Sequence, residues 1–555
     1  MDHQDQPQDH DQEQESAVEN VVPTFDSPND DDSFNQDVGP ALYDDLAIDA
    51  DLAAANPDLV DDMRQTDERC RLSGRDKCNL IVGLVLICIV VVGVLVPVVL
   101  IKREEAEIED SKNITTAAPT VSPMPTASPT SLRALERDAI TANIVAATNT
   151  PPEVLDDPNT PQGMALDWLL YEDPARLTDL SPNLIQKYAL MTLFYGSDGQ
   201  SSDILDWDDN GVADECSWYG IGCHGDAEGT NSSISSPTFA SISSIQINGT
   251  NLFGSLVSEI GLLSDLNILR LSQNQFSGEL PEELFDLQQL IRLSLEENKF
   301  TSTISNGIGR LSNLQVLSMY DNSFDGNLPA TMGNLANLRE LYLHFNFLSG
   351  PIVDYLLQMP LLEVVDVALN RFSGGIPASI SSLGRVKTLI LGGNLFSGEI
   401  PPELGDVSSL KELILSENRF DGTIPTALGQ LSSLTYLAID QCELSGPIPS
   451  ELGQLSQLTY LDLSEQILTG FIPRQLGNLT SLEQLSLSQN NLRGNIPSEL
   501  GACAKLQVLK LIANNVGGSV PLEICALRPD PLEILTTDCR SQVTCPPGCC
   551  TSCGR

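Results

Sequence analysis

The feature that most constrains this chain is a 24-residue repeat that runs from Thr250 to Asn514. Around each anchor residue the sequence has the form L-x-x-L-x-L-x-x-N-x-φ-x-G-x-φ-P, where φ is a bulky apolar residue. Self-similarity at such a period is typical of solenoids, in which each unit contacts only its neighbours. The anchors predict twelve stacked coils; they are Thr250, Asn274, Asn298, Asn322, Asn346, Asn370, Asn394, Asn418, Cys442, Gln466, Asn490 and Asn514.

The letters of one coil predict its local structure. The alternation that starts at Leu269 indicates a short strand with leucines inside and the intervening residue outside. We expect each anchor side chain to turn inward, where Asn supplies donors and an acceptor to backbone groups of adjacent coils. Thr250 and Cys442 can make part of these bonds, whereas the longer Gln466 predicts a local distortion.

Composition and cysteine placement set further limits. The 555 residues carry a net charge of −47, which argues against nucleic acid and other polyanions as partners. Of the 13 cysteines, Cys70, Cys78 and Cys88 lie before or within an apolar run, and ten follow it. This division predicts two redox compartments separated by a membrane.

Residues 1–78 are predicted to be a disordered acidic tail in the cytosol. The segment 1–62 contains no Lys or Arg and few large apolar side chains, so it cannot bury enough surface to offset the entropy of ordering. The apolar positions of Ala41–Leu52 could form one side of a short helix that docks on a cytosolic adaptor, and Tyr43–Leu46 resembles a tyrosine-based sorting signal. The competing interpretation is a solvated tail without a specific partner.

Residues 79–101 are predicted to be a transmembrane helix. The unbroken apolar run from Leu80 to Ile101 is long enough to cross a hydrocarbon core of about 30 Å. Basic residues are concentrated before the run, which places the N-terminus in the cytosol. All four N-glycosylation sequons follow it, at Asn113, Asn231, Asn248 and Asn478. We therefore expect a single-pass type II protein of the plasma membrane with extracellular repeats.

Four regions follow the predicted membrane helix. They are a Pro/Ser/Thr stalk, a helical N-terminal cap, the repeats and a Cys-rich C-terminal cap, at residues 102–132, 133–238, 239–521 and 522–555. Caps are expected because an open solenoid end exposes leucines and strand edges. Cys216 and Cys223 predict a disulfide in the N-terminal cap, and the seven C-terminal cysteines favour disulfides over zinc, with one thiol left over.

The stretch Cys216–Cys223 has the form C-x-W-x-G-φ-x-C and is followed by L-x-x-L-x-L-x-x-N-x-L-x-G-x-I-P coils, so it resembles the plant-type leucine-rich-repeat receptor-like proteins. The resemblance covers roughly residues 160–525 and implies an α/β repeat, a leucine-rich-repeat solenoid whose concave strand face binds an external ligand. Receptor kinases of this family have the opposite topology and an internal kinase. Here the Gly-rich phosphate loop, H-R-D and D-F-G motifs are absent, so we expect no enzyme activity.

A calcium loop is a weaker candidate in the N-terminal cap. Asp206, Asp208 and Asn210 match the first half of such a loop. Oxygen ligands at alternate positions, followed by a Gly at the turn, suit Ca²⁺. The twelfth position is Ser217, where a bidentate Glu is expected, and this departure favours an acidic turn over a metal site. No other cofactor is expected, since the four histidines form no recognisable metal or catalytic cluster.

Ligand recognition is expected at the outward positions of the concave face. Aromatic and apolar residues gather in the coils around Asn322 to Asn394, and aromatics rimmed by polar side chains are typical of binding hot spots. The candidate ligand-binding residues are Tyr320, Tyr342, His344, Phe345, Asp366, Leu369 and Ile390, and a second group is Tyr436, Tyr460 and Asp462. The alternative is that exposed aromatics are scattered by chance or pack on their neighbours.

The sequence thus predicts twelve coils with a helical cap, one membrane helix and a disordered acidic tail. Its predicted function is that of a cell-surface receptor-like protein, which binds an extracellular peptide, small ligand or protein and signals through a co-receptor or cytosolic adaptor. The alternative is a structural protein of adhesion or of a surface matrix.

Overall fold

The inner strands of the coils form one continuous sheet. The computed structural model describes residues 131–202, 205, 207, 214–224, 241–538 and 543–553. Fifteen strands pair in this sheet, and β1 (Ile221–Cys223) joins its N-terminal edge antiparallel to β2. The strands that precede the expected anchors are β2 (Ile242–Gln246), β4 (Ile268–Arg270), β6 (Arg292–Ser294), β8 (Val316–Ser318), β10 (Glu340–Tyr342), β12 (Val364–Asp366), β14 (Thr388–Ile390), β16 (Glu412–Ile414), β18 (Tyr436–Ala438), β20 (Tyr460–Asp462), β22 (Gln484–Ser486) and β24 (Val508–Lys510). Two further strands, β26 (Ile534–Thr537) and β28 (Ser552–Cys553), extend the C-terminal edge.

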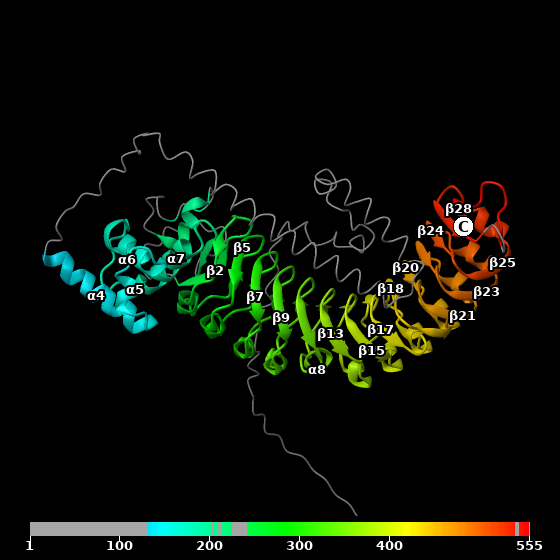
Figure 1. Cartoon of the computed structure of the whole chain (residues 1–555), viewed down its shortest axis with the longest axis horizontal. Helices are drawn as coiled ribbons and strands as arrows, with labels where there is room; N and C mark the ends of the chain where they lie inside the picture. Colours follow the sequence, from blue (N-terminus) through cyan, green and yellow to red (C-terminus); the bar gives the residue numbers. More distant parts are fainter. Residues whose placement is uncertain are drawn as a thin grey trace, which may run out of the picture. The chain divides into compact units, whose positions relative to one another are not determined.

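The register of this sheet is constant along the repeats. Leu341 of β10 lies opposite Leu317 of β8 and Val365 of β12, so each pairing steps by one full repeat. The Leu341 side chain is fully buried, and the inward leucines of successive coils pack into a single core. The coils follow an arc, with the inner sheet on its concave side and α8 (Val353–Leu356) on its outer side (Figure 1).

A second layer of strands, which the sequence analysis did not anticipate, follows the anchors. Eight of these strands pair in one sheet and five in another. They are β3 (Phe253–Gly254), β5 (Gln275–Gly278), β7 (Lys299–Thr303), β9 (Ser323–Asn327), β11 (Phe347–Gly350), β13 (Arg371–Gly374), β15 (Leu395–Glu399) and β17 (Arg419–Asp421), then β19 (Ser445–Pro447), β21 (Ile467–Phe471), β23 (Asn491–Asn495), β25 (Asn515–Ser519) and β27 (Val543–Thr544). The eight-stranded and the five-stranded outer sheets meet between β17 and β19, where the pairing is reduced to an isolated bridge of Thr423 with Ser445. This interruption lies in the coil in which Cys442 replaces the anchor Asn.

The outer turns of most coils are single turns of 3-10 helix. A proline at the N-cap precedes many of them and presets the extended backbone from which the turn starts, as at Pro401. The outer helices are η5 (Ser258–Leu262), η6 (Glu282–Asp286), η7 (Asn306–Arg310), η8 (Ala330–Asn334), η9 (Ala378–Ser382), η10 (Pro402–Asp406), η11 (Thr426–Gln430), η12 (Ser450–Gln454), η13 (Arg474–Asn478) and η14 (Ser498–Ala502), with α8 and α9 (Leu522–Cys525) in equivalent places.

The anchor asparagines form hydrogen bonds between coils. Asn370 Oδ1 accepts from the Leu348 amide of the preceding coil at 2.9 Å. Its Nδ2 donates to the carbonyls of Leu343 at 2.8 Å and Ala368 at 3.1 Å. The same pattern recurs at Asn394. These bonds satisfy backbone groups that the strands leave unpaired at the end of each coil.

The anchors that are not Asn differ from expectation at one position. Gln466 keeps the two bonds to the preceding coil, because its Oε1 accepts from Leu444 N at 2.8 Å and its Nε2 donates to Ile439 O at 2.5 Å. The neighbouring inner strands stay in register, so the predicted distortion was wrong. Cys442 Sγ donates to Leu415 O at 3.5 Å. This hydrogen bond is weaker than that of an Asn amide, because a thiol is a poor donor.

The N-terminal end is closed by helices packed on aromatic side chains. These elements are α4 (Ser131–Thr148), α5 (Pro152–Leu155), α6 (Pro161–Tyr171), α7 (Leu184–Gly196), η3 (Gly199–Ser201) and η4 (Glu215–Ser217). Helices α6 and α7 lie within the region predicted to be a helical cap, whereas α4 begins at Ser131, inside the predicted stalk. Trp218 stacks on Trp207 and meets Trp168 edge to face, so three indoles form the centre of the cap.

Several predictions concern residues that the structure does not describe. The acidic tail with Ala41–Leu52, the membrane helix at 79–101 and the stalk up to residue 130 all lie outside the described residues. Within the part of the chain that is described, no helix combines the length and the apolar character needed to cross a membrane.

Candidate ligand-binding face

The concave face consists of the outward positions of the inner strands and of the turn that follows each strand. In β10, Leu341 points into the core while Glu340 and Tyr342 are partly exposed on the other side. The next two outward positions of this coil are His344 and Phe345, and their equivalents recur once in every repeat. Because the inner strands are rigidly hydrogen-bonded, side chains far apart in the sequence lie in fixed rows.

The structure brings three predicted residues, Tyr320, His344 and Phe345, into ring contact, and together with Tyr342 of the same coil they are here called the aromatic cluster. Tyr320 stacks on His344 with ring centroids 4.3 Å apart, and Phe345 meets the same imidazole edge to face at 5.6 Å. Phe345 is 45 % exposed and its backbone is left-handed, with φ of 52°. A large apolar ring held open to solvent in a rigid turn is a ready contact for a ligand.

The two tyrosines of this cluster are polarised by acidic neighbours. The Tyr320 hydroxyl lies 3.3 Å from Glu297 and the Tyr342 hydroxyl 3.5 Å from Glu340. Burial first, and then acidic neighbours, raise the pKa of both phenols well above the usual range; these neighbours are Glu296 and then Glu297 for Tyr320, and Glu340 for Tyr342. Both side chains therefore remain neutral hydrogen-bond donors at any physiological pH.

The remaining predicted residues continue the cluster across the next strands. Tyr342 pairs with Asp366, and Asp366 with Ile390, so the three form one row over three strands. Asp366 Oδ2 lies 3.1 Å from His344 Nδ1, which makes an ion pair when the imidazole is protonated, although no aligned hydrogen bond is formed. Leu369 lies over Gly393, within 2.6 Å of where a β-carbon would be, so it fills the space that this glycine leaves.

A second group of side chains lies further along the same face. This tyrosine–aspartate cluster consists of Tyr436, Asp440, Tyr460 and Asp462. The two phenol rings stack with centroids 4.1 Å apart. Asp462 Oδ1 accepts from the amide and the hydroxyl of Ser464, at 2.8 and 2.5 Å. Burial and then the charge of Asp440 raise the pKa of Asp462 to about 6, and burial also raises the pKa of Asp440.

Sequence reasoning underestimated this second cluster. Tyr436 and Tyr460 occupy the same position in two successive coils, which predicts that they are neighbours. The sequence does not mark Asp440 as a member of a binding site, because polar residues are common at its coil position. Its partner Ser416, whose hydroxyl donates to Asp440, stands at the equivalent position of the preceding coil.

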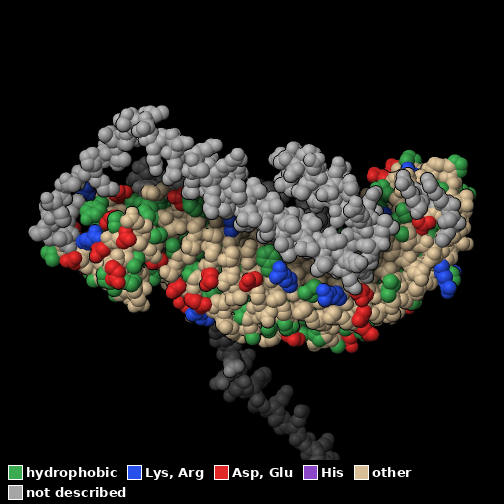
Figure 2. Space-filling model, in the orientation of Figure 1, with side chains coloured by type: hydrophobic (Ala, Val, Ile, Leu, Met, Phe, Trp, Pro, Cys, Tyr) green, Lys and Arg blue, Asp and Glu red, His purple; other side chains and the backbone are tan. Residues whose placement is uncertain are grey.

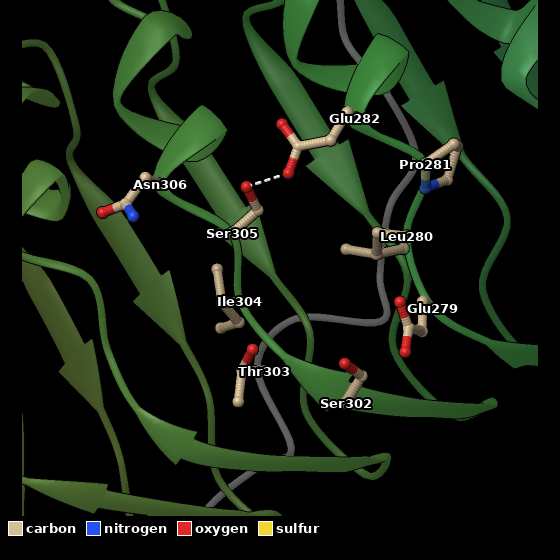
Figure 3. A pocket seen from close by; sticks show the side chains of 9 residues that line it. All are labelled: Glu279, Leu280, Pro281, Glu282, Ser302, Thr303, Ile304, Ser305 and Asn306. Carbon is tan, nitrogen blue, oxygen red and sulfur yellow. Dashed lines mark hydrogen bonds between the residues drawn. The ribbon is translucent and has the colours of Figure 1, made fainter.

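A hollow of about 500 Å³ lies away from the concave face, between the outer turns of two coils. Its walls are residues 279–282 and 302–306, and Ser305 donates across it to Glu282 (Figure 3). Ser302 and Ser305 stand where most other coils have Gly and Pro. The hollow therefore coincides with a departure from the repeat, and it brings together none of the predicted ligand-binding residues.

The other candidate sites have mixed outcomes. Asp206, Asp208 and Asn210 lie outside the described residues, and within the described ones no group of three acidic, His or Cys side chains is arranged to hold a metal ion. Asn248 and Asn478 are exposed, as glycosylation requires. Asn113 and Asn231 fall in segments that are not described.

Disulfides staple both ends of the solenoid. The predicted Cys216–Cys223 bond is present in the N-terminal cap. In the C-terminal cap, Cys525 pairs with Cys549 and Cys545 with Cys550. Cys503 is a free buried thiol at the end of η14.

Parallel strands stepping by one constant repeat, inward asparagines that link neighbouring coils and an open concave face define a leucine-rich-repeat solenoid. The family described as leucine-rich repeat region matches residues 244–368 and 378–526. The repeats are similar to those of plant receptor-like kinases among curated and solved proteins.

Three relatives illustrate the likeness. A probable leucine-rich-repeat receptor-like serine/threonine-protein kinase, RPK1 of Arabidopsis thaliana, is 28 % identical over 141 residues, which is 23 % of this chain and 25 % of that protein. The ectodomain of the receptor kinase GASSHO1/SCHENGEN3 from Arabidopsis thaliana, in complex with CASPARIAN STRIP INTEGRITY FACTOR 2, is 36 % identical with a TM-score of 0.50, over 53 % of this chain and 34 % of that chain. The PEPR1-AtPEP1 structure is 34 % identical with a TM-score of 0.52, over 60 % of this chain and 49 % of that chain. This chain therefore spans less than half of each of them.

Proposed function

We propose that this protein is a leucine-rich-repeat receptor whose concave face binds an extracellular peptide or protein. The aromatic cluster carries the proposal, because Phe345 is exposed in a fixed turn beside His344, whose ring is already held by Tyr320 and Asp366. Ordered aromatic side chains lose little entropy when a ligand covers them. The similarity to a receptor kinase ectodomain that holds a separate factor supports the same role.

We further propose that the repeats are extracellular and that residues 79–101 anchor them as a type II membrane protein. Disulfides form and persist in oxidising compartments, and both caps of the solenoid are closed by them. The exposed sequons at Asn248 and Asn478 fit this location. The signal would then pass through a co-receptor or through a cytosolic adaptor bound to the N-terminal tail.

The test is to measure retention of secreted ligands by the full-length chain. The probe is the low-molecular-mass peptide fraction of medium conditioned by cells that express the protein, passed over immobilised wild type, Phe345→Ala and Phe347→Ala. Phe347 is a matched control, because it is 46 % exposed and close in sequence but lies on the outer strand β11. We expect Phe345→Ala to lose the retained peptides and Phe347→Ala to keep them. Equal retention by both variants would overturn the proposal and leave the adhesion role.

A further inference from the structure

The middle of the concave face carries acidic side chains without basic ones. Over the eight coils from the anchor Asn322 to the anchor Asn490, all of which the structure describes, the outward positions hold no Lys or Arg. The carboxylates at these positions are Asp321, Glu340, Asp366, Glu412, Glu417, Asp440, Asp462 and Glu465. The border of the face holds Arg339 and Lys387, which both pair with Glu363, and also Lys411. Basic residues return to outward positions in the coils on either side, at Arg292 and Lys510. Outside the concave face the charges are mixed, and the side of the molecule seen in Figure 2 shows basic side chains scattered among acidic ones.

These carboxylates repel one another in partly buried positions. Burial and then the charge of Asp366 raise the pKa of Glu412, and burial and then Glu465 raise the pKa of Glu417. Asp440 and Asp462 behave in the same way, with burial again the largest cause. An array of negative charges with no Lys or Arg at the outward positions of the same eight coils is complementary to a positively charged ligand.

Within this array, the tyrosine–aspartate cluster combines aromatic rings and carboxylates in the way that suits the binding of one cationic group. The stacked rings of Tyr436 and Tyr460 present π-electron density beside Asp440 and Asp462, and the Tyr460 hydroxyl lies 3.4 Å from Asp462. Aromatic faces attract ammonium and guanidinium groups, and neighbouring carboxylates add hydrogen-bond acceptors.

An unused polar group at the same place also points to a ligand. Ser488 occupies an outward position of the adjoining coil, and its carbonyl accepts from the Glu465 amide at 2.9 Å. Its side chain is 8 % exposed, yet the hydroxyl oxygen has no hydrogen-bond partner. Leaving a buried hydroxyl without a partner destabilises the free protein, and a ligand acceptor or donor would remove that cost.

We infer that the tyrosine–aspartate cluster binds the ammonium or guanidinium group of a Lys or Arg side chain in the peptide ligand, with the hydroxyl of Ser488 bonded to the same peptide. This inference rests on the proposed function. A basic side chain suits the cluster better than a bare metal ion, because the carboxylates in the described residues do not converge on one point.

The test measures binding of a defined probe to the full-length chain by fluorescence anisotropy. The probe is a fluorescein-labelled nonapeptide of alternating Gly and Lys, with the matching Gly and Glu peptide and free spermidine as comparisons. The variant Asp440→Asn/Asp462→Asn keeps an acceptor oxygen in both side chains and removes two charges. The control Glu283→Gln/Glu499→Gln removes the same charge from exposed carboxylates of η6 and η14 on the outer side.

We expect the lysine peptide to bind wild type and the control alike, and to bind the aspartate variant about tenfold more weakly. Equal binding by the two double variants would mean non-specific attraction and would overturn the inference, as would binding of the glutamate peptide. Displacement by spermidine at equal concentration would assign the site to a free polyamine instead of a peptide. If the lysine peptide bound nothing while Phe345-dependent retention of secreted peptides persisted, this inference would fall and the proposed function would stand.

Discussion

Lys187 and Asp173 form an ion pair with a 2.8 Å Nζ–Oδ1 distance in which both side chains are completely buried. The ammonium group also lies 5.7 Å from the ring centroids of both Trp168 and Trp218, so it sits between two indoles at the centre of the N-terminal cap. Such a site holds a charge only while its partners stay in place.

Removing one partner of this pair should therefore destabilise the cap more than removing both charges. We expect Lys187→Met to lower the free energy of unfolding by about 3 kcal/mol, because Asp173 is left charged and unpaired. The double variant Lys187→Met/Asp173→Asn keeps the acceptor that bonds the Ala175 amide and should recover part of this loss. Urea denaturation followed by tryptophan fluorescence measures both. A double variant less stable than the single one would contradict the argument.

The asparagine ladder makes a second prediction. Asn370→Ala removes the partner of the Leu348 amide and of several carbonyls in the core, so we expect a loss of about 3 kcal/mol. Cys442→Asn should instead gain about 1 kcal/mol, because an amide can bond the Leu415 carbonyl more strongly than a thiol can. Differential scanning calorimetry of the two variants should show midpoints shifted in opposite directions, and shifts of the same sign would refute this role of the ladder.

A third prediction concerns the one coil whose outer strand lacks its glycine. Ser302 has φ of 79°, close to the 81° of Gly278 and the 71° of Gly326 at the same coil position. A side chain in this region of backbone space is strained, so Ser302→Gly should stabilise the protein by about 1 kcal/mol. Gly326→Ser is the reverse control, because its β-carbon would lie 2.6 Å from Thr303 Cγ2. Chemical denaturation that ranked the two variants in the opposite order would show that the strain is absent.

The raised pKa of Asp462 predicts how stability depends on pH. The folded pKa of about 6 exceeds the ordinary value of 3.8, so between these values the folded state binds a proton that the unfolded state releases. This penalty is absent below about pH 4, grows as the pH rises to 6 and is constant above it. Asp462→Asn should therefore stabilise the protein by about 1 kcal/mol at pH 7 and by little at pH 4, as thermal melts at both values would show. An equal gain at both pH values would assign the effect to packing.

The repeat made the inner sheet predictable from sequence, because one coil determines its neighbours. The positions of Leu341 and Asn370 follow from the period alone, as does the contact between Tyr436 and Tyr460. The outer sheets were missed because their strands alternate only weakly in polarity and depend on pairing with the next coil. The length of the Gln466 side chain predicts a distortion, but its flexibility lets the amide reach the same partners as an Asn would.

The candidate site was predicted less completely than the fold. Coil position shows that Tyr320 and His344 are neighbours, but not that their rings stack or that Phe345 stays exposed. Rotamers and shared burial decide these features, and they arise only when neighbouring coils pack. The charge state of Asp462 could not be read from sequence for the same reason, since it depends on Asp440 in another coil.

Because the register of the inner sheet is constant, the number of coils between two residues determines the distance between them. Tyr342 and Tyr460 are separated by five strand steps of about 4.8 Å, a span of about 24 Å that an extended chain of about seven residues can bridge. Deleting one whole repeat unit between them would preserve every pairing on either side and shorten this span by one step. The length of ligand that reaches both clusters is therefore set by the number of coils between them, and a duplication or loss of one unit would retune it without altering either cluster.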